Sequence, residues 1–164
     1  MSSFAVNENI LIRFAEEKDA ALILQFIREL AEYEKMPDQV IATLEDIRET
    51  IFEKGYAEVV ICDFDGIPAG FCLFFHNYST FLGKPGLYIE DLYVKESARG
   101  KGLGKSLLKF MARLAVERSC GRLEWWCLDW NRPSIDFYVS QGAEAMSDWT
   151  VYRVSGEKLK KLAE

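Results

Sequence analysis

Apolar positions follow a helical period in several stretches of the chain and a strand-like pattern in others. The first helical stretch, residues 18–34, carries one apolar stripe and ends before Pro37. The second begins after Thr43, which together with Asp46 three residues later resembles a capping signal, and it runs to about residue 54. A third helix is predicted over about residues 102–118, and a short fourth over residues 133–140.

The other apolar runs predict strands over residues 10–14, 57–63, 68–76, 87–94, 123–128 and 149–154. Asp65 and Gly66 separate the second and third runs, which predicts an antiparallel hairpin. A strand, a helix and a further strand imply a parallel crossover. The sequence therefore predicts an α/β fold with a mixed sheet covered by helices. Because there is no repeat or linker-like tract, one domain over residues 1–164 is expected.

Charge is unevenly distributed along a chain that is acidic as a whole. The chain has 20 basic and 26 acidic side chains and a net charge of −6, so no general affinity for nucleic acid or a membrane surface is expected. Residues 1–98 hold 8 basic and 18 acidic side chains, whereas residues 99–164 hold 12 and 8. This asymmetry indicates one cationic and one anionic ligand. By charge alone, an ordinary solvated helix face is the simpler interpretation.

The cysteines and the single histidine argue against a metal site and against disulfides. The four cysteines form no C-x-x-C pair, and His76 is the single histidine, so no metal site is expected. The sequence shows no leader-like segment and no apolar run of membrane-spanning length. We therefore expect a cytoplasmic protein with reduced cysteines.

A glycine-rich segment, Arg99-Gly100-Lys101-Gly102-Leu103-Gly104, lies between an apolar strand and an amphipathic helix. Glycines let the backbone approach a ligand, and the helix start offers unpaired amides at a positive dipole end. The segment therefore predicts a site for phosphate or pyrophosphate, with a capped helix and a solvated basic face as the alternative. Neither the P-loop pattern nor the dinucleotide fingerprint fits, because each requires a glycine where this sequence has another residue.

The pattern Arg99-x-x-Gly102-x-Gly104 resembles the acetyl-CoA motif of the GNAT N-acetyltransferase superfamily. Residues 87–94 (LYIEDLYV), 129–138 (DWNRPSIDFY) and 28–34 (RELAEYE) resemble its diamine branch, the spermidine/spermine and thialysine acetyltransferases. The resemblance runs from about residue 10 to residue 162. It implies the GNAT fold, with a mixed twisted sheet of six to seven strands flanked by about four helices.

The resemblance also implies acetyl-CoA as co-substrate and a set of binding residues. The cofactor-binding set is Leu92, Tyr93, Val94, Arg99, Gly100, Lys101, Gly102, Leu103, Gly104, Lys105, Asn131, Pro133 and Tyr138. Tyr33, Glu34 and Glu90 would line the amine pocket. Ser79 and Thr80 suit the polar end of a short amino acid or diamine.

Acetyl transfer requires a neutral amine, whereas a lysine-like amine has a pKa near ~10.4. Glu90 is the candidate base, because it interrupts an apolar strand where desolvation raises a carboxyl pKa. Strict alternation turns Asp91 to the opposite face. The alternative for Glu90 is a sheet-edge carboxylate with a structural partner. Tyr138 lies one helical turn into the helix predicted over residues 133–140, for which Asn131 is the candidate N-cap. It is expected to hydrogen-bond the departing sulfur, and the alternative is a core residue.

Two substrate interpretations stay open. Residues 78–81 resemble the thialysine branch, whereas residues 133–138 also resemble the polyamine branch. The prediction is N-acetylation of a small cationic amine by direct attack in a ternary complex, with a homodimer as a family expectation. The alternatives are a non-catalytic sensor that binds CoA or a nucleotide, and a protein or peptide N-acetyltransferase. Trp125, Trp126, Trp130 and Trp149 are interpreted as core or interface residues.

Overall fold

The computed structural model describes residues 3–164 of the chain. These residues form two compact units, one that ends at Trp126 and one over Cys127–Glu164. The first unit contains a β-sheet and the helices that cover it, and the second contains two short helices. One domain over residues 1–164 stays a prediction.

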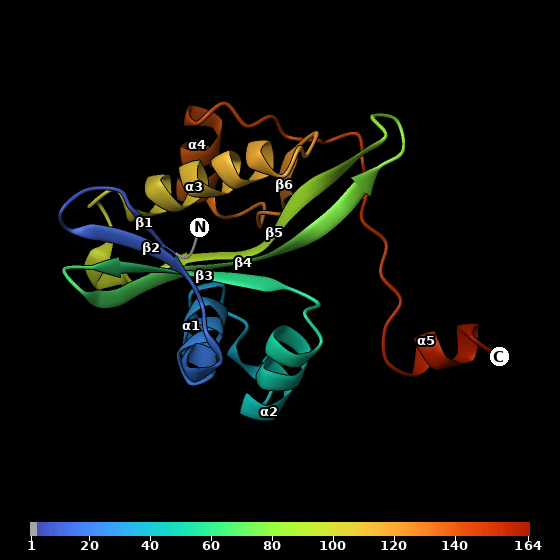
Figure 1. Cartoon of the computed structure of the whole chain (residues 1–164). Helices are drawn as coiled ribbons and strands as arrows, with labels where there is room; N and C mark the ends of the chain where they lie inside the picture. Colours follow the sequence, from blue (N-terminus) through green and yellow to red (C-terminus); the bar gives the residue numbers. More distant parts are fainter. Residues whose placement is uncertain (1–2) are drawn as a thin grey trace. The chain divides into compact units, whose positions relative to one another are not determined.

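A six-stranded sheet forms the centre of the first unit, with the strands in chain order. Among the described strands, four neighbouring pairs are antiparallel and one pair, β5 with β6, is parallel. The sheet is therefore mixed, as predicted. The strands are β1 (Ser3–Ala5), β2 (Ile10–Phe14), β3 (Glu58–Phe64), β4 (Ile67–Ser79), β5 (Lys84–Val94) and β6 (Leu123–Trp125). β4 and β5 form a long hairpin that extends past the other strands (Figure 1).

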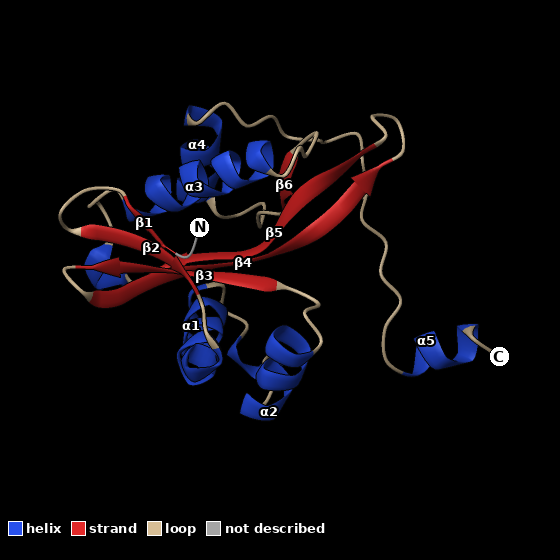
Figure 2. Cartoon of the chain, viewed as in Figure 1, coloured by secondary structure: helices blue, strands red, loops and turns tan. Residues whose placement is uncertain are grey.

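Helices cover both faces of this sheet (Figure 2). α1 (Ala20–Tyr33) and α2 (Leu44–Ile47), which continues as a π-helix over Arg48–Glu53, lie on one face, and α3 (Leu103–Glu117) lies on the other. Single 3-10 turns occur at Glu17–Asp19, Pro37–Gln39 and Glu96–Ala98. Thr43 caps α2 as predicted, since its Oγ1 accepts from Asp46 N at 3.1 Å and Asp46 Oδ2 accepts from Thr43 N at 2.8 Å.

The sheet is held between two apolar layers. On the α1 face, Phe26 stacks on Phe71 of β4 with ring centroids 5.4 Å apart. On the α3 face, the predicted stripe is buried at Leu103, Leu107 and Met111. Burial of such side chains stabilises the fold by about 2 kcal/mol each, and it fixes β5 between the helices.

Two connections differ from the sequence-based topology. α3 connects the parallel strands β5 and β6, as the predicted crossover requires. β2 and β3, in contrast, pair antiparallel although two helices connect them. The predicted hairpin turn is confirmed, because Asp65 and Gly66 both have positive φ, +51° and +76°. Strand β1 was not predicted, since three residues carry too little periodicity.

The second unit contains α4 (Arg132–Ser140) and α5 (Glu157–Leu162). The helix predicted over residues 133–140 is confirmed, whereas the strand predicted over residues 149–154 is wrong, because that segment has no regular structure. Alternating apolar residues favour a strand only where a neighbouring edge supplies hydrogen bonds, and the pattern alone cannot provide that edge. For the same reason β6 ends at Trp125 rather than at residue 128.

Candidate active site

A β-bulge in β5 places the acidic pair Glu90 and Asp91. Ile89 lies opposite Phe74 and Asp91 lies opposite Leu73, so Glu90 is the extra residue in β5. A bulge resets the alternation of side chains along the strand. Asp91 therefore shares a face with Tyr88, and the strict alternation expected from the sequence is wrong at this point.

β5 and β6 separate where the bulge begins. β6 pairs only with Leu87–Ile89, and residues 91–94 of β5 have no β6 partner among the described residues. Lys95 N donates to Ala69 O at 2.8 Å, and hydrogen-bonded pairs alternate along an antiparallel ladder. The backbone groups of Leu92 and Val94 consequently point away from β4, while those of Tyr93 point toward it. The carbonyl of Val94 accepts from Arg99 Nε at 3.1 Å, as this orientation requires.

The glycine-rich segment forms an open turn at the start of α3. Gly100 and Gly102 have φ of +77° and +85°, a left-handed conformation that glycine adopts without strain. No atom lies within 4 Å of a Cβ built at either glycine, so the turn is accessible. A Cβ at Gly104 would lie 4.0 Å from Val94 Cγ2, so this turn adjoins the separated end of β5. The first amides of α3 have no intrahelical acceptor, and Lys101 and Lys105 are exposed beside them.

Carboxylates gather on the α1 side of β5. Burial raises the pKa of Glu34, which follows the last residue of α1. Burial, together with the charges of Glu90 and Glu34, raises the pKa of Asp91 to about 7. Glu90 itself is exposed. The desolvation expected for Glu90 thus acts on its neighbour Asp91. Strict alternation assigned Asp91 to the opposite face, because a bulge leaves no signal in the apolar pattern.

Tyr33 and Tyr93 connect α1 to the same end of β5. The guanidinium of Arg99 lies 4.5 Å from the centroid of the Tyr33 ring. Tyr93 is buried against Phe26, and burial with a hydrogen bond to Glu29 raises its pKa to about 12. The structure therefore brings together Tyr33, Glu34 and Asp91 beside Arg99 and the open edge of β5.

Ser79 and Thr80 lie elsewhere in the first unit. Ser79 is the last residue of β4, six residues from Leu73, which corresponds to about 20 Å at ~3.3 Å per residue. Its Oγ accepts from Leu82 N at 3.3 Å and so stabilises the turn. Thr80 is exposed in that turn. The structure does not bring these two residues to the carboxylates of the same chain.

Three predicted site residues belong to the second unit. Asn131 caps α4 as predicted, with its Oδ1 accepting from Ser134 N at 3.4 Å. Pro133 lies in the first turn of α4, where its missing amide is not needed. Tyr138 is half-buried, with its ring centroid 5.3 Å from that of Phe137. These residues form one local group on α4.

Other candidate chemistry is limited. Within residues 3–164, no group of three or more histidine, cysteine, aspartate or glutamate side chains could hold a metal ion. No helix in the same range is both long and apolar enough to cross a bilayer. Burial raises the pKa of the Cys62 thiol to about 12 and also raises that of Cys72. Both thiols are therefore unreactive core groups.

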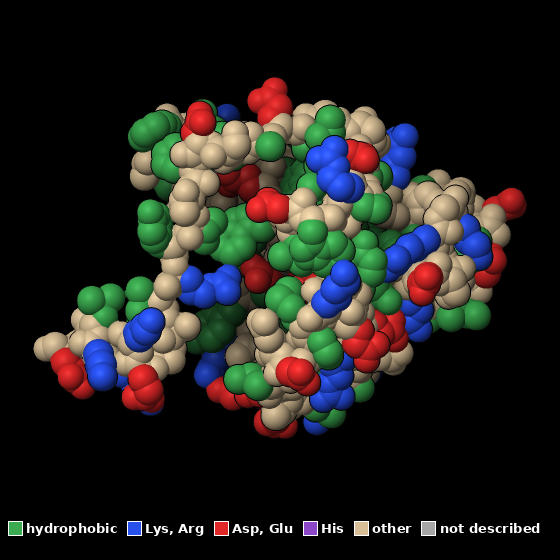
Figure 3. All heavy atoms as spheres, turned by 180° about the vertical axis from the view of Figure 1, so that it is seen from behind, with side chains coloured by type: hydrophobic (Ala, Val, Ile, Leu, Met, Phe, Trp, Pro, Cys, Tyr) green, Lys and Arg blue, Asp and Glu red, His purple; other side chains and the backbone are tan. Residues whose placement is uncertain are grey.

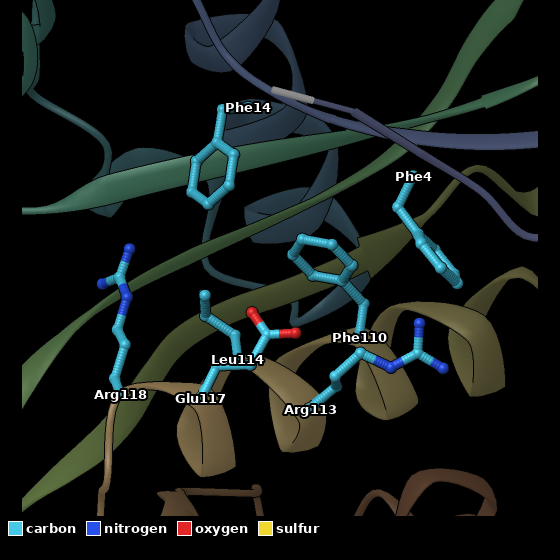
Figure 4. Close-up of a pocket in the computed structure, with 7 residues that line it drawn as sticks. All are labelled: Phe4, Phe14, Phe110, Arg113, Leu114, Glu117 and Arg118. Carbon is cyan, nitrogen blue, oxygen red and sulfur yellow. The ribbon is translucent and has the colours of Figure 1, made fainter. Parts of the chain in front are cut away.

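A cavity of about 220 Å³ lies between α3 and the first two strands (Figure 4). Three phenyl rings and two guanidinium groups are part of its lining, which consists of Phe4, Phe14, Phe110, Arg113, Leu114, Glu117 and Arg118. Arg118 forms a bidentate ion pair with Glu58, and Arg113 lies 4.3 Å from the Phe4 ring centroid. None of the predicted site residues lines this cavity.

Comparison with known proteins identifies the family. The sequence profile described as "Acetyltransferase (GNAT) family" matches residues 23–143, and the chain belongs to this family. It is an acetyltransferase with a GNAT fold, as the resemblance implied. The chain is 37% identical to thialysine N-epsilon-acetyltransferase of Bos taurus, over 94% of this chain and 97% of that protein.

Two further comparisons agree. The chain is 31% identical to spermidine/spermine N(1)-acetyltransferase-like protein 1 of Homo sapiens, over 93% of this chain and 23% of that protein. Among solved structures, an integron cassette protein from the mobile metagenome of V. cholerae matches with a TM-score of 0.81 and 27% identity, over 96% of this chain and 99% of that one.

Proposed function

We propose that this protein transfers an acetyl group from acetyl-CoA to a primary amine of a small cationic amine, by direct attack in a ternary complex. One observation carries the proposal. β5 leaves β6 at the bulge, and its open edge adjoins an accessible glycine turn on one side and the half-buried carboxylates of Glu34 and Asp91 on the other. An anionic donor and a cationic acceptor would thus meet at one strand.

The donor would bind along the open edge and the turn. The amides of Leu92 and Val94 point away from β4 and are available to amide groups of a pantetheine arm. The first amides of α3, with Lys101 and Lys105, fit a pyrophosphate, because a helix N-terminus combines donors with a positive dipole end. Arg99 would complete the turn while it holds the Val94 carbonyl. Members of this family generally use acetyl-CoA as acetyl donor.

The amine would enter from the acidic side. At pH 7 only about one lysine-like amine in a few thousand is neutral, which corresponds to about 4–5 kcal/mol. A carboxylate near the amine lowers this cost by accepting the proton. Asp91, with a pKa of about 7, is matched to that task, and Glu90 would act beside it from the solvent side, through water. Tyr33 and Glu34 would line the same entrance.

Tyr138 would act on the leaving group, with Asn131 and Pro133 at the cofactor arm. A tyrosine hydroxyl has a pKa near ~10 and a thiol near ~8.5, so complete proton transfer to the thiolate is uphill by about 2 kcal/mol. Tyr138 would therefore stabilise the departing sulfur mainly by donating a hydrogen bond. Its place in α4 follows from the Asn131 cap, which sets the start of the helix.

The relatives support an amine of limited size. They are named as acetyltransferases of thialysine and of spermidine or spermine, all small amines with several cationic groups. The net charge of −6 and the carboxylates at β5 favour such an acceptor. We also propose that the protein is a homodimer in the cytoplasm.

A thiol-release assay tests the proposed function. Purified protein is mixed with acetyl-CoA and a panel of thialysine, lysine, ornithine, diamines and polyamines, and free CoA is measured. We expect release with at least one of these amines and at least tenfold less release by Asp91→Asn. Acetyl-CoA binding with no release across the panel would contradict the proposal and identify a sensor instead.

A further inference from the structure

Three aromatic rings lie next to one another on β4, on β5 and directly after β6. The rings of Phe75 and Tyr88 are 5.1 Å apart, and those of Tyr88 and Trp126 are 5.8 Å apart with an interplanar angle of 84°. Perpendicular contacts of this kind fix the orientation of both rings. Trp126 is nevertheless 56% exposed, so its indole is held in place while part of it stays open to solvent. This exposure argues against the interpretation of Trp126 as a core residue.

Trp126 lies at the point where β5 and β6 separate. The last pair of the β5–β6 ladder is Ile89 with Trp125, so Trp126 is the first residue after the ladder, and Glu90 is the residue that follows the same pair in β5. Tyr88 and Asp91 share one face of β5, on either side of the bulge, and Trp126 contacts Tyr88 on that face. The indole therefore lies on the face of β5 that also carries Asp91.

The charges around this indole favour a cation. Arg122 would oppose one, but its Nε is paired with Glu124 Oε2 at 2.8 Å. The same carboxylate oxygen accepts from Asn77 Nδ2 at 2.8 Å, which holds the pair in the sheet. Glu90 and Asp91 follow Tyr88 by two and three residues in β5 and add negative charge to this part of the strand. Figure 3 shows acidic side chains among hydrophobic ones on one face of the molecule.

We propose that Trp126 binds the second, non-reacting ammonium group of the substrate through a cation–π contact. The inference rests on the proposed function and specifies its substrate class. Tryptophan is the strongest cation–π partner among the aromatic residues. The open backbone of Leu92 lies two residues beyond Glu90, about 7 Å at ~3.3 Å per residue. The acceptor would thus carry its two amino groups on a short chain, with one at the thioester and one at Trp126.

A pair of isosteric amines tests the contact. (5-Aminopentyl)trimethylammonium and 6,6-dimethylheptylamine share a primary amine and a shape, and differ in the charge of the distal group. The wild-type protein should prefer the cation in kcat/KM. Trp126→Ala should reduce that preference about fivefold to tenfold, and Trp126→Phe should reduce it less. Trp149→Ala, at a residue that is 74% exposed in the second unit, serves as control and should leave the preference unchanged.

The outcomes separate this inference from the proposed function. Turnover with an equal preference in the wild type and in Trp126→Ala would overturn the inference and leave the proposed function standing. If neither amine is acetylated, the proposed function fails for such substrates, and calorimetry with (5-aminopentyl)trimethylammonium decides the subsite alone. A Kd weakened about fivefold in Trp126→Ala would support it, and an unchanged Kd would overturn it.

Discussion

The carboxylate of Glu34, which follows α1, raises the pKa of Asp91 across the space between that helix and β5. Burial of Asp91 is the larger cause, and Glu90 adds to it, so the pKa reaches about 7. A carboxyl group with a pKa near 7 is only partly ionised at neutral pH, and its ionisation lowers the stability of the folded protein. Active sites commonly contain groups of this kind, because the same surroundings adjust proton affinity for catalysis.

The first prediction concerns stability. The unfolded chain ionises Asp91 near its ordinary value of 3.8, and the folded protein does so only near 7. The folded state therefore binds the extra proton between these values, so stability falls as the pH rises from 3.8 to 7. Asp91→Asn removes this loss and should raise the free energy of unfolding at pH 8, by at most about 4 kcal/mol. Urea unfolding at pH 8 and pH 4.5 measures the effect.

The gain in Asp91→Asn should be much smaller at pH 4.5, where the native carboxyl group is protonated. Asp65→Asn, in the exposed hairpin turn between β3 and β4, provides a comparison at a site without this surrounding charge. An equal gain for Asp91→Asn at both pH values would show that Asp91 ionises normally in the folded protein.

The second prediction concerns the pH dependence of catalysis. If Asp91 accepts the proton of the amine, kcat/KM should rise with pH through an apparent pKa near 7, the value that burial and the neighbouring charges produce. Asp91→Asn should remove this limb and lower activity at pH 8 at least tenfold. Glu90→Gln should keep the limb and shift it to lower pH, because one negative neighbour is lost. A limb that persists unchanged in Asp91→Asn would exclude Asp91 as the base.

The third prediction concerns the turn before α3. Gly102 has φ of +85°, where a side chain costs about 1–2 kcal/mol. Gly102→Ala should therefore raise the KM for acetyl-CoA several-fold and leave kcat for the amine nearly unchanged. Gly142→Ala, with φ of +91° in the second unit, is the matched control for backbone strain. Equal increases of KM in both variants would mean that the effect comes from lost stability.

The fourth prediction concerns Tyr138. Tyr138→Phe removes the hydroxyl and keeps the ring that packs beside Phe137, so we expect kcat to fall at least tenfold while the Kd for acetyl-CoA changes less than threefold. Tyr152→Phe, at a side chain that is 91% exposed, should have no effect. Equal losses in kcat and in acetyl-CoA binding would assign Tyr138 a structural role.

Local signals in the sequence predicted much of the fold. The Thr43–Asp46 capping box, the Asp65-Gly66 turn and the Asn131 cap all form as expected, because each depends on residues close in sequence. The glycine turn before α3 is also a local feature, because glycines at positive φ determine its conformation. Such features require no knowledge of distant contacts.

Features that depend on pairing were not predictable in this way. The bulge at Glu90 changes the face on which Asp91 lies, and it arises from the register between β4 and β5 rather than from composition. Residues 149–154 have a strand-like pattern and yet form no strand. Trp126 was interpreted as a core or interface residue, because its contact with Tyr88 depends on the pairing of β5 with β6.

Backbone hydrogen exchange with and without acetyl-CoA tests the central claim most directly. If the donor binds along the separated edge of β5 and the turn before α3, the amides of Leu92, Val94 and residues 102–105 should exchange at least tenfold more slowly in its presence. The amides of β2 and β3 should change little and serve as internal reference. Protection confined to other segments, with Leu92, Val94 and the glycine turn unchanged, would contradict the account.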